Sequence, residues 1–197
     1  MPAVAIGVAL ITLVYAGGQI SGAHYNPAIS LAINLRGKMS APKMMEYWIA
    51  QIVGGVLGAL LGGILCGGSF AAIAVGDGAT GWQAFLAEVV FTFFLCFVVL
   101  STATSSKADG NSYFGAAIGL TVMAGALSVG SISGGAFNPA VALGLNLSSG
   151  FSNMIYCAVS VAAELVGGAL AAGVFYMVAP DEFNANGATE GETTSLL

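Results

Sequence analysis

The sequence predicts an all-α membrane protein in which five spanning helices and two short half-helices form an inverted repeat. Its 197 residues are 57% hydrophobic and only 7% charged, with a mean hydropathy of +0.92. Soluble domains carry about a quarter charged residues, so this chain could not cover a water-facing surface. Five apolar stretches are long enough to cross a bilayer, and one short helix-interrupting motif occurs twice.

The five spans are predicted from length and apolar composition. A helix needs about 20 apolar residues, at about 1.5 Å of rise each, to cross about 30 Å of hydrocarbon. The stretches that meet this requirement are Pro2–Ile20, Tyr47–Val75, Ala84–Thr104, Tyr113–Val129 and Met154–Ala179.

A repeated motif relates the two halves of the chain. SGAHYNPAIS at Ser21–Ser30 returns as SGGAFNPAVA at Ser133–Ala142, and nine of sixteen positions are identical between Ile20–Leu35 and Ile132–Leu147. Three predicted spans separate the copies, so the copies enter the membrane from opposite faces. This arrangement is typical of an inverted repeat, whose functional site lies near the midplane.

The repeat also predicts the domain organisation. Residues 1–179 form one membrane domain, with a first repeat at 1–75 and a second at 84–179. Polar residues dominate after Pro180, so we expect residues 180–197 to be a flexible acidic tail.

Each copy of the motif begins a helix that is too short to span. Pro27–Leu35 and Pro139–Leu147 have nine residues each, a rise of about 13 Å. Asn followed by Pro is a strong helix start, because Asn caps the helix and Pro is tolerated at its first position. We therefore expect two re-entrant half-helices, preceded by non-helical backbone that is buried or lines a water-filled cavity.

Two such helix starts meeting head to head would bind a neutral polar solute. The asparagine NH₂ groups could donate to a solute oxygen, while the positive helix ends would repel cations. This suits a pore that passes neutral solutes and excludes protons. The candidate pore residues are Asn26, Pro27, Ala28, Asn138, Pro139 and Ala140, with the loop backbone of Gly22, Ala23, His24, Tyr25, Gly134, Gly135, Ala136 and Phe137.

The paired SGxxxNPA motifs, AEVVFT at Ala87–Thr92 and YWIAQIVGG at Tyr47–Gly55 resemble the aquaporin or major intrinsic protein family over about residues 1–179. The resemblance implies a homotetramer with one pore per subunit and neither cofactor nor metal. It also implies that Glu88 supports the second pore loop through hydrogen bonds to its backbone. The family's first of six spanning helices has no counterpart here, so we expect an incomplete sequence or a five-span chain.

The resemblance also places a narrow filter at Ile6, Ala126, Gly135 and Val141. Water-selective members typically have aromatic, histidine and arginine side chains at these positions. Small and aliphatic residues predict a wider, apolar filter instead. We therefore expect a channel for water and small uncharged solutes, such as glycerol or urea.

Other functions remain open at this point. Ionisable residues inside spans are usually functional, so Glu88 and Glu164 leave a proton-coupled secondary transporter as an alternative, and a non-conducting fragment is a third reading. Glu164 stands where the family commonly has proline and could be either a structural or a functional residue. His24 could fix the first loop or act in pH gating. An enzyme is not expected, because the chain has no nucleophile–base pair, metal cluster or cofactor motif.

The basic residues predict the orientation. Arg36, Lys38, Lys43 and Lys107 fall in two loops separated by two crossings, so they share one side, which the positive-inside rule makes cytoplasmic. The acidic tail would lie on that side. Without a basic patch, nucleic-acid binding is not expected. The membrane itself, plasma or intracellular (vacuolar or endosomal), stays open.

A row of small residues predicts a close helix contact. Gly54, Gly58 and Gly62 recur at every fourth position of the second span. Such a row lets the backbones of two membrane helices approach closely. We expect another helix to cross this face.

Overall fold

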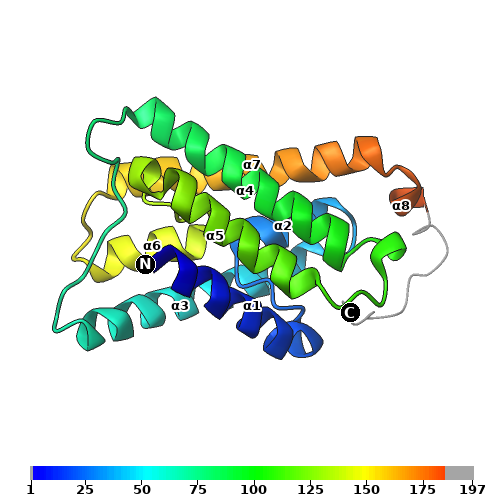
Figure 1. Ribbon diagram of the computed structural model, residues 1–197, viewed down its shortest axis with the longest axis horizontal. Helices are drawn as coiled ribbons and strands as arrows, with labels where there is room; N and C mark the ends of the chain where they lie inside the picture. Colours follow the sequence, from blue (N-terminus) through cyan, green and yellow to red (C-terminus); the bar gives the residue numbers. More distant parts are fainter. Residues whose placement is uncertain (1, 185–197) are drawn as a thin grey trace.

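The computed structural model describes residues 2–184, and all regular secondary structure in that range is helical (Figure 1). The helices in chain order are α1 (Pro2–Ser21), α2 (Pro27–Leu35), α3 (Ala41–Leu65), α4 (Gly81–Ala103), the short 3₁₀ helix η1 (Ser106–Ala108), α5 (Phe114–Ser133), α6 (Pro139–Ser148), α7 (Met154–Val178) and α8 (Asp181–Asn184).

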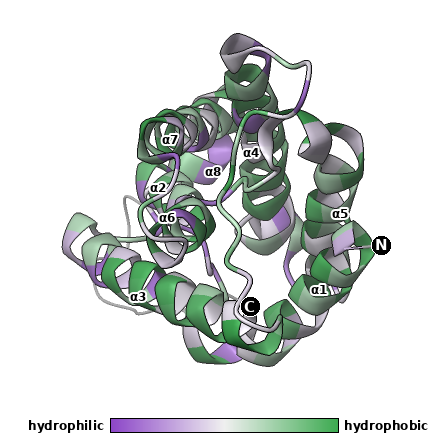
Figure 2. Cartoon of the chain, turned by 90° about the vertical axis from the view of Figure 1, so that its left-hand side faces the viewer, coloured by the Kyte–Doolittle hydropathy of each residue, from purple (hydrophilic) through white to green (hydrophobic). Residues whose placement is uncertain are grey.

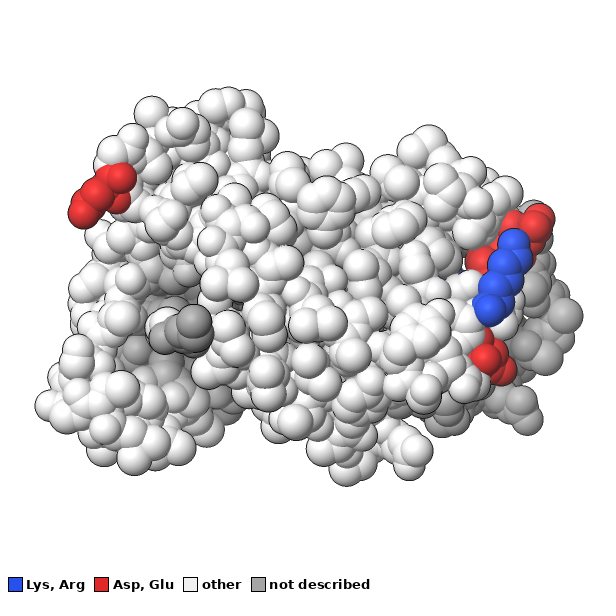
Figure 3. Space-filling model, in the orientation of Figure 1, with Lys and Arg blue, Asp and Glu red and all other residues white. Residues whose placement is uncertain are grey.

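The prediction of five spans and two half-helices is confirmed. Helices α1, α3, α4, α5 and α7 have 20 to 25 residues and are apolar enough to cross a membrane. On the face shown in Figure 3, charged atoms are confined to the two ends, and an uncharged belt lies between them. The half-helices α2 and α6 have 9 and 10 residues. The chain is an integral membrane protein that crosses the bilayer several times.

The predicted boundaries of the second span are wrong. The helix begins at Ala41, six residues earlier than expected, because Ser40 caps it by accepting from the Lys43 N–H. It ends at Leu65, where Gly67 and Gly68 adopt positive φ angles of 73° and 86°. Hydropathy alone could not show this end, because the apolar composition continues beyond it.

The expectation of a flexible tail from Pro180 is also wrong for its first residues. Residues 181–184 form α8, and Glu182 is buried. The rest of the predicted tail lies outside the described residues. The ion pair that Glu182 makes explains why this polar segment is ordered.

The two halves of the chain interlock through their half-helices. Helix α2 packs against α7 of the second repeat, and α6 packs against α3 of the first (Figure 1). Gly168 makes the first contact possible, because a Cβ there would lie 2.7 Å from the Ala28 carbonyl oxygen. Gly55 has the same role against the carbonyl of Ala140. The two glycines therefore allow α2 and α6 to be clamped at the centre of the bundle.

The prediction that Gly54, Gly58 and Gly62 mark a helix crossing is wrong for the described residues. A Cβ at any of the three would meet nothing within 4 Å. In the second half, α4 packs against both α7 and α5. The equivalent place beside α3 and α1 holds no helix of residues 2–184 and is instead a groove of about 600 Å³, lined in part by Gly54. Figure 2 shows α3 and α1 along the same side of the bundle.

Candidate functional site: a central pore

The two copies of the motif fold into the same local structure. Gly22, Ala23 and Tyr25 in the first loop have positive φ angles of 72°, 49° and 49°. The equivalent residues of the second loop, Gly134, Gly135 and Phe137, have 88°, 63° and 48°. Positive φ is uncommon for residues other than glycine. Its recurrence at Tyr25 and Phe137 shows that each loop is held in a backbone conformation that these residues rarely adopt.

The two asparagines cap the half-helices as the Asn-Pro pattern predicts. The Asn26 side-chain oxygen accepts from the Ala28 N–H, and the Asn138 oxygen accepts from the Ala140 N–H, both at 2.9 Å. Helices α2 and α6 are in contact, and hydrogen bonds between the two loops hold their N-termini close together. Because a helix N-terminus carries a partial positive charge, the centre between the two N-termini is unfavourable for a cation.

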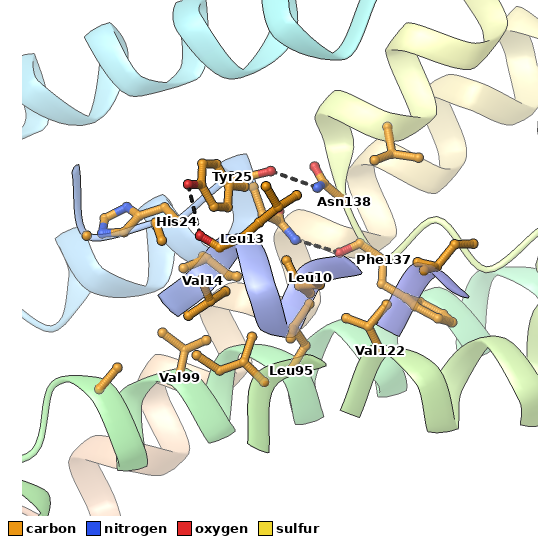
Figure 4. A pocket seen from close by; sticks show the side chains of 18 of the residues that line it. Leu10, Leu13, Val14, His24, Tyr25, Leu95, Val99, Val122, Phe137 and Asn138 are labelled. Atoms are coloured by element: carbon orange, nitrogen blue, oxygen red, sulfur yellow. Dashed lines mark hydrogen bonds between the residues drawn. The ribbon is translucent and has the colours of Figure 1, made fainter. Parts of the chain in front are cut away.

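Each asparagine also binds the opposite loop. The Asn26 Nδ2 donates to the Phe137 carbonyl at 2.8 Å, and the Asn138 Nδ2 donates to the Tyr25 carbonyl at 2.9 Å (Figure 4). An amide group has two N–H donors, so this bridge uses one from each asparagine. The expectation that these donors serve a solute therefore holds for at most the second N–H of each.

A cavity of about 350 Å³ passes this centre. It extends from Ile6 near the start of α1 to Thr104 after the end of α4, and both capping asparagines line it. Figure 4 shows aliphatic side chains from α1 and α4, including Leu10, Val14 and Val99, on the wall facing the two loops. The cavity is thus mostly apolar, with its polar groups concentrated at the two loops.

The structure brings three of the four predicted filter residues to this cavity. Ile6, Gly135 and Val141 line it, whereas Ala126 is not among its lining residues. Val122, one turn earlier on α5, lines it instead. The loop residues Gly22 to Tyr25 also line the cavity, as do Gly135 to Phe137. Gly134, Pro27, Ala28, Pro139 and Ala140 are not among the lining residues and build the half-helices and loop behind it.

Glu88 lies behind the second pore loop. Its carboxylate is fully buried and accepts from the Ala136 N–H at 3.1 Å and from the Phe137 N–H at 2.7 Å. Tyr156 supports the start of the same loop by donating to the Ser133 carbonyl at 2.6 Å. Tyr47 makes the equivalent bond to the Ser21 carbonyl in the first half, at 2.8 Å.

His24 is held within the first loop region. Its Nδ1 lies 3.0 Å from the Ser30 Oγ, and the ring is only 4% exposed. Ser30 also accepts from the Gln51 side chain on α3, at 2.9 Å. The His24 Nε2 has no hydrogen-bond partner in residues 2–184, and the residue lines both the central cavity and the groove beside α3.

A buried ion pair attaches α8 to one end of the helix bundle. The Arg36 guanidinium donates to the Glu182 carboxylate at 2.6 Å and to the Thr104 carbonyl at 2.8 Å. Burial alone would raise the pKa of the Glu182 carboxyl, but hydrogen bonds from Ser106 and Ser105, together with the charge of Arg36, lower its pKa to about 2. Helix α8 is thereby joined to the end of α2 and to the Thr104 segment that lines the cavity.

Comparison with known proteins decides the family. The sequence model described as "Major intrinsic protein" matches residues 1–176, and a second match covers residues 112–195. The chain belongs to the major intrinsic protein, or aquaporin, family. The second match begins within the second repeat and includes the second copy of the motif, in agreement with the internal duplication.

Relatives within the aquaporin family are about one-third identical. The chain is 36% identical over 179 residues to aquaporin AqpM of Methanothermobacter marburgensis, covering 85% of this chain and 72% of that protein. It is 35% identical over 181 residues to aquaporin NIP1-1 of Zea mays, covering 90% of this chain but 63% of that protein. The aquaglyceroporin from Plasmodium falciparum has the same fold, with a TM-score of 0.77 and 22% identity over 91% of this chain and 83% of that one.

Several residues of the site could not be found by the sequence motifs. The bridge from each asparagine to the other loop joins residues more than 110 positions apart, as in Asn26 and Phe137. The Arg36–Glu182 pair likewise joins residues 146 positions apart. The available signal for the ion pair was only that acidic residues follow the last span, which predicted a flexible acidic tail.

Proposed function

We propose that this chain forms a passive channel for water and small uncharged solutes through the central cavity. The observation that carries the proposal is the composition of the lining. Both capping asparagines are at the cavity, and its lining residues include neither Asp, Glu, Lys nor Arg. A neutral solute can replace some of its water hydrogen bonds there, whereas an ion cannot recover its hydration energy from an apolar wall.

The centre of the cavity supports selection against cations. Each asparagine has a second N–H beyond the one that bridges the loops, and these N–H groups can donate to a passing water or hydroxyl oxygen. The N-termini of α2 and α6 face the same point, so their partial positive charges oppose entry of a proton or metal cation. This geometry supports a channel in which a neutral solute crosses without a counter-ion.

The residues at the predicted filter favour the permeation of solutes larger than water. Ile6, Gly135 and Val141 line the cavity where the family resemblance puts the constriction, and none of them donates a side-chain hydrogen bond. A wall of this kind has no fixed positive charge and leaves room beside Gly135. We propose glycerol-like or urea-like solutes as the permeating class, together with water.

The test is solute flux into liposomes that contain the purified chain. A channel predicts flux that rises linearly with the glycerol or urea concentration and does not depend on a pH gradient. A saturable flux driven by the pH gradient would show a proton-coupled transporter instead. Flux equal to that of protein-free liposomes would show that the chain alone does not conduct.

We further propose a homotetramer with one pore per subunit, with Arg36, Lys38, Lys43 and Lys107 on the cytoplasmic side. Large apolar side chains such as Ile49 and Leu57 on α3 are more than half exposed, so lipid or a neighbouring subunit must cover them in a membrane. Mass measurement in detergent tests the assembly. Labelling of single cysteines introduced at Lys38 and Asp77 in intact cells tests the orientation.

A further inference from the structure

Two buried carboxyl groups lie together behind the second pore loop. Glu88 on α4 and Glu164 on α7 are both fully buried. The two helices pack closely at this level, because Gly167 lets α7 approach the α4 backbone; a Cβ there would lie 2.6 Å from the Val89 carbonyl oxygen. Glu164 lies three residues before Gly167 on α7 and Glu88 lies directly before Val89 on α4, so the two carboxyl groups lie beside the same helix contact.

The hydrogen bonds of the two groups differ. Both Glu88 oxygens accept from backbone N–H groups, those of Ala136 and Phe137. Glu164 Oε1 accepts from the Ser160 hydroxyl at 3.2 Å. Within residues 2–184, no donor faces Glu164 Oε2. Glu88 is therefore bonded as an anion, whereas one oxygen of Glu164 would be left without a donor if it were ionised.

The surroundings supply no positively charged side chain to balance two anions. The four basic residues of the chain lie at or beyond helix ends, in the first turn of α3, or in η1. The neighbouring Tyr156 directs its hydroxyl to the Ser133 carbonyl. Two fully buried carboxylates beside the same helix contact cannot both remain ionised. One proton must be present on the pair.

We propose that Glu164 carries this proton and donates it from Oε2 to the Glu88 carboxylate, so that the pair holds the loop Ala136–Asn138 as one unit with a single negative charge. This assigns Oε2 an acceptor and explains why it faces no donor. Glu164 acts on the pore through Glu88 and is therefore a positioning residue. Neither carboxyl is among the residues that line the cavity, so the pair lies beside the pathway and not on it.

Infrared spectroscopy of the full chain in lipid at pH 7 tests the shared proton directly. The wild-type protein should show the C=O stretching band of a buried protonated carboxyl group, and Glu164→Gln should lose it while the protein stays folded. Glu182 does not contribute to this band, because its pKa of about 2 keeps it ionised at pH 7. The Ser160→Ala variant is the matched control and should keep the band. Absence of the band in the wild type, or its persistence in Glu164→Gln, would overturn the proposal.

The effect on the pore rests on the proposed channel function and is measured separately. Gln can donate from its NH₂ group to Glu88, so Glu164→Gln should keep the solute permeability. Leu has no donor, so Glu164→Leu should lower permeability about fivefold, the factor expected for loss of one hydrogen bond that positions the loop. Equal permeability of the Leu and Gln variants in a conducting channel would overturn the positioning role. If neither the wild type nor any variant conducts, the infrared result still decides whether the two carboxyl groups share a proton.

Discussion

The side-chain amide of Asn26 donates to the backbone carbonyl of Phe137 at 2.8 Å, and its oxygen caps the helix that follows. One side chain therefore fixes the start of α2 and ties it to the loop of the opposite repeat. Asn138 does the same in the reverse direction. The centre of the pore is held by these four bonds, which is why both asparagines have structural as well as solute-binding consequences.

Substitution of Asn26 should separate capping from bridging. Serine can cap a helix but is too short to reach Phe137, so Asn26→Ser should lower the free energy of unfolding by about 1 kcal/mol, the net value of one hydrogen bond. Alanine loses both bonds, and Asn26→Ala should lower it by about 2 kcal/mol. Denaturant-induced unfolding in detergent measures both. A Ser variant as stable as wild type would show that the bridge contributes nothing.

Two glycines of α3 with different surroundings should respond to alanine with opposite signs. Gly55 lies against the Ala140 carbonyl, so Gly55→Ala should push α6 away and lower the unfolding free energy by about 1–3 kcal/mol. Gly58 faces open space, so Gly58→Ala should raise stability by up to about 1 kcal/mol through helix propensity. Thermal unfolding followed by circular dichroism compares them. A destabilising Gly58→Ala would show that another helix covers this face in the membrane.

The Glu182 carboxylate should keep α8 attached down to acidic pH. Its pKa is about 2 in the folded protein and about 4.5 when the group is free in solution, so it stabilises the fold fully above about pH 4.5. That contribution should be lost progressively as the pH falls from 4.5 towards 2. Hydrogen exchange of the α8 amides at a series of pH values measures it. Loss of protection between pH 7 and 5 would contradict this assignment.

Removing the charge of Glu182 tests the same contact at neutral pH. Glu182→Gln leaves the buried Arg36 without its counter-ion, which should cost about 3 kcal/mol of stability. Asp181→Asn is the matched control on the exposed side of α8 and should change stability by less than about 0.5 kcal/mol. Equal unfolding temperatures of the two variants would show that the ion pair does not hold α8.

The elements of this fold could be predicted where local chemistry determines them. Asn26 and Pro27 encode a helix start by themselves, and the structure begins α2 at that point. Two copies with the same pattern and an odd number of spans between them were enough to predict that α2 and α6 meet. The end of α3 could not be predicted in this way, because Gly67 and Gly68 stop the helix inside a stretch that remains apolar.

The remaining differences between the sequence predictions and the structure concern contacts between segments that are distant in the chain. Glu182 is one acidic residue in a polar segment, and only the folded chain places it beside Arg36. The row Gly54, Gly58 and Gly62 has the pattern of a helix contact, but a pattern does not supply the partner helix. Ala126 was placed at the filter by family spacing, whereas Val122 on the same helix lines the cavity.

Val141 offers the most direct test of the proposed channel, because it lines the cavity immediately after the second Asn-Pro-Ala motif. The measurement is the ratio of glycerol to water permeability in liposomes by stopped-flow light scattering, for wild type, Val141→Leu and Val141→Arg. An arginine should narrow the cavity and add a fixed charge, so the ratio should fall about tenfold, a barrier change of about 1.4 kcal/mol, while Leu should leave it nearly unchanged. Wild-type glycerol permeability equal to that of empty liposomes, or a ratio that Val141→Arg does not alter, would contradict the account.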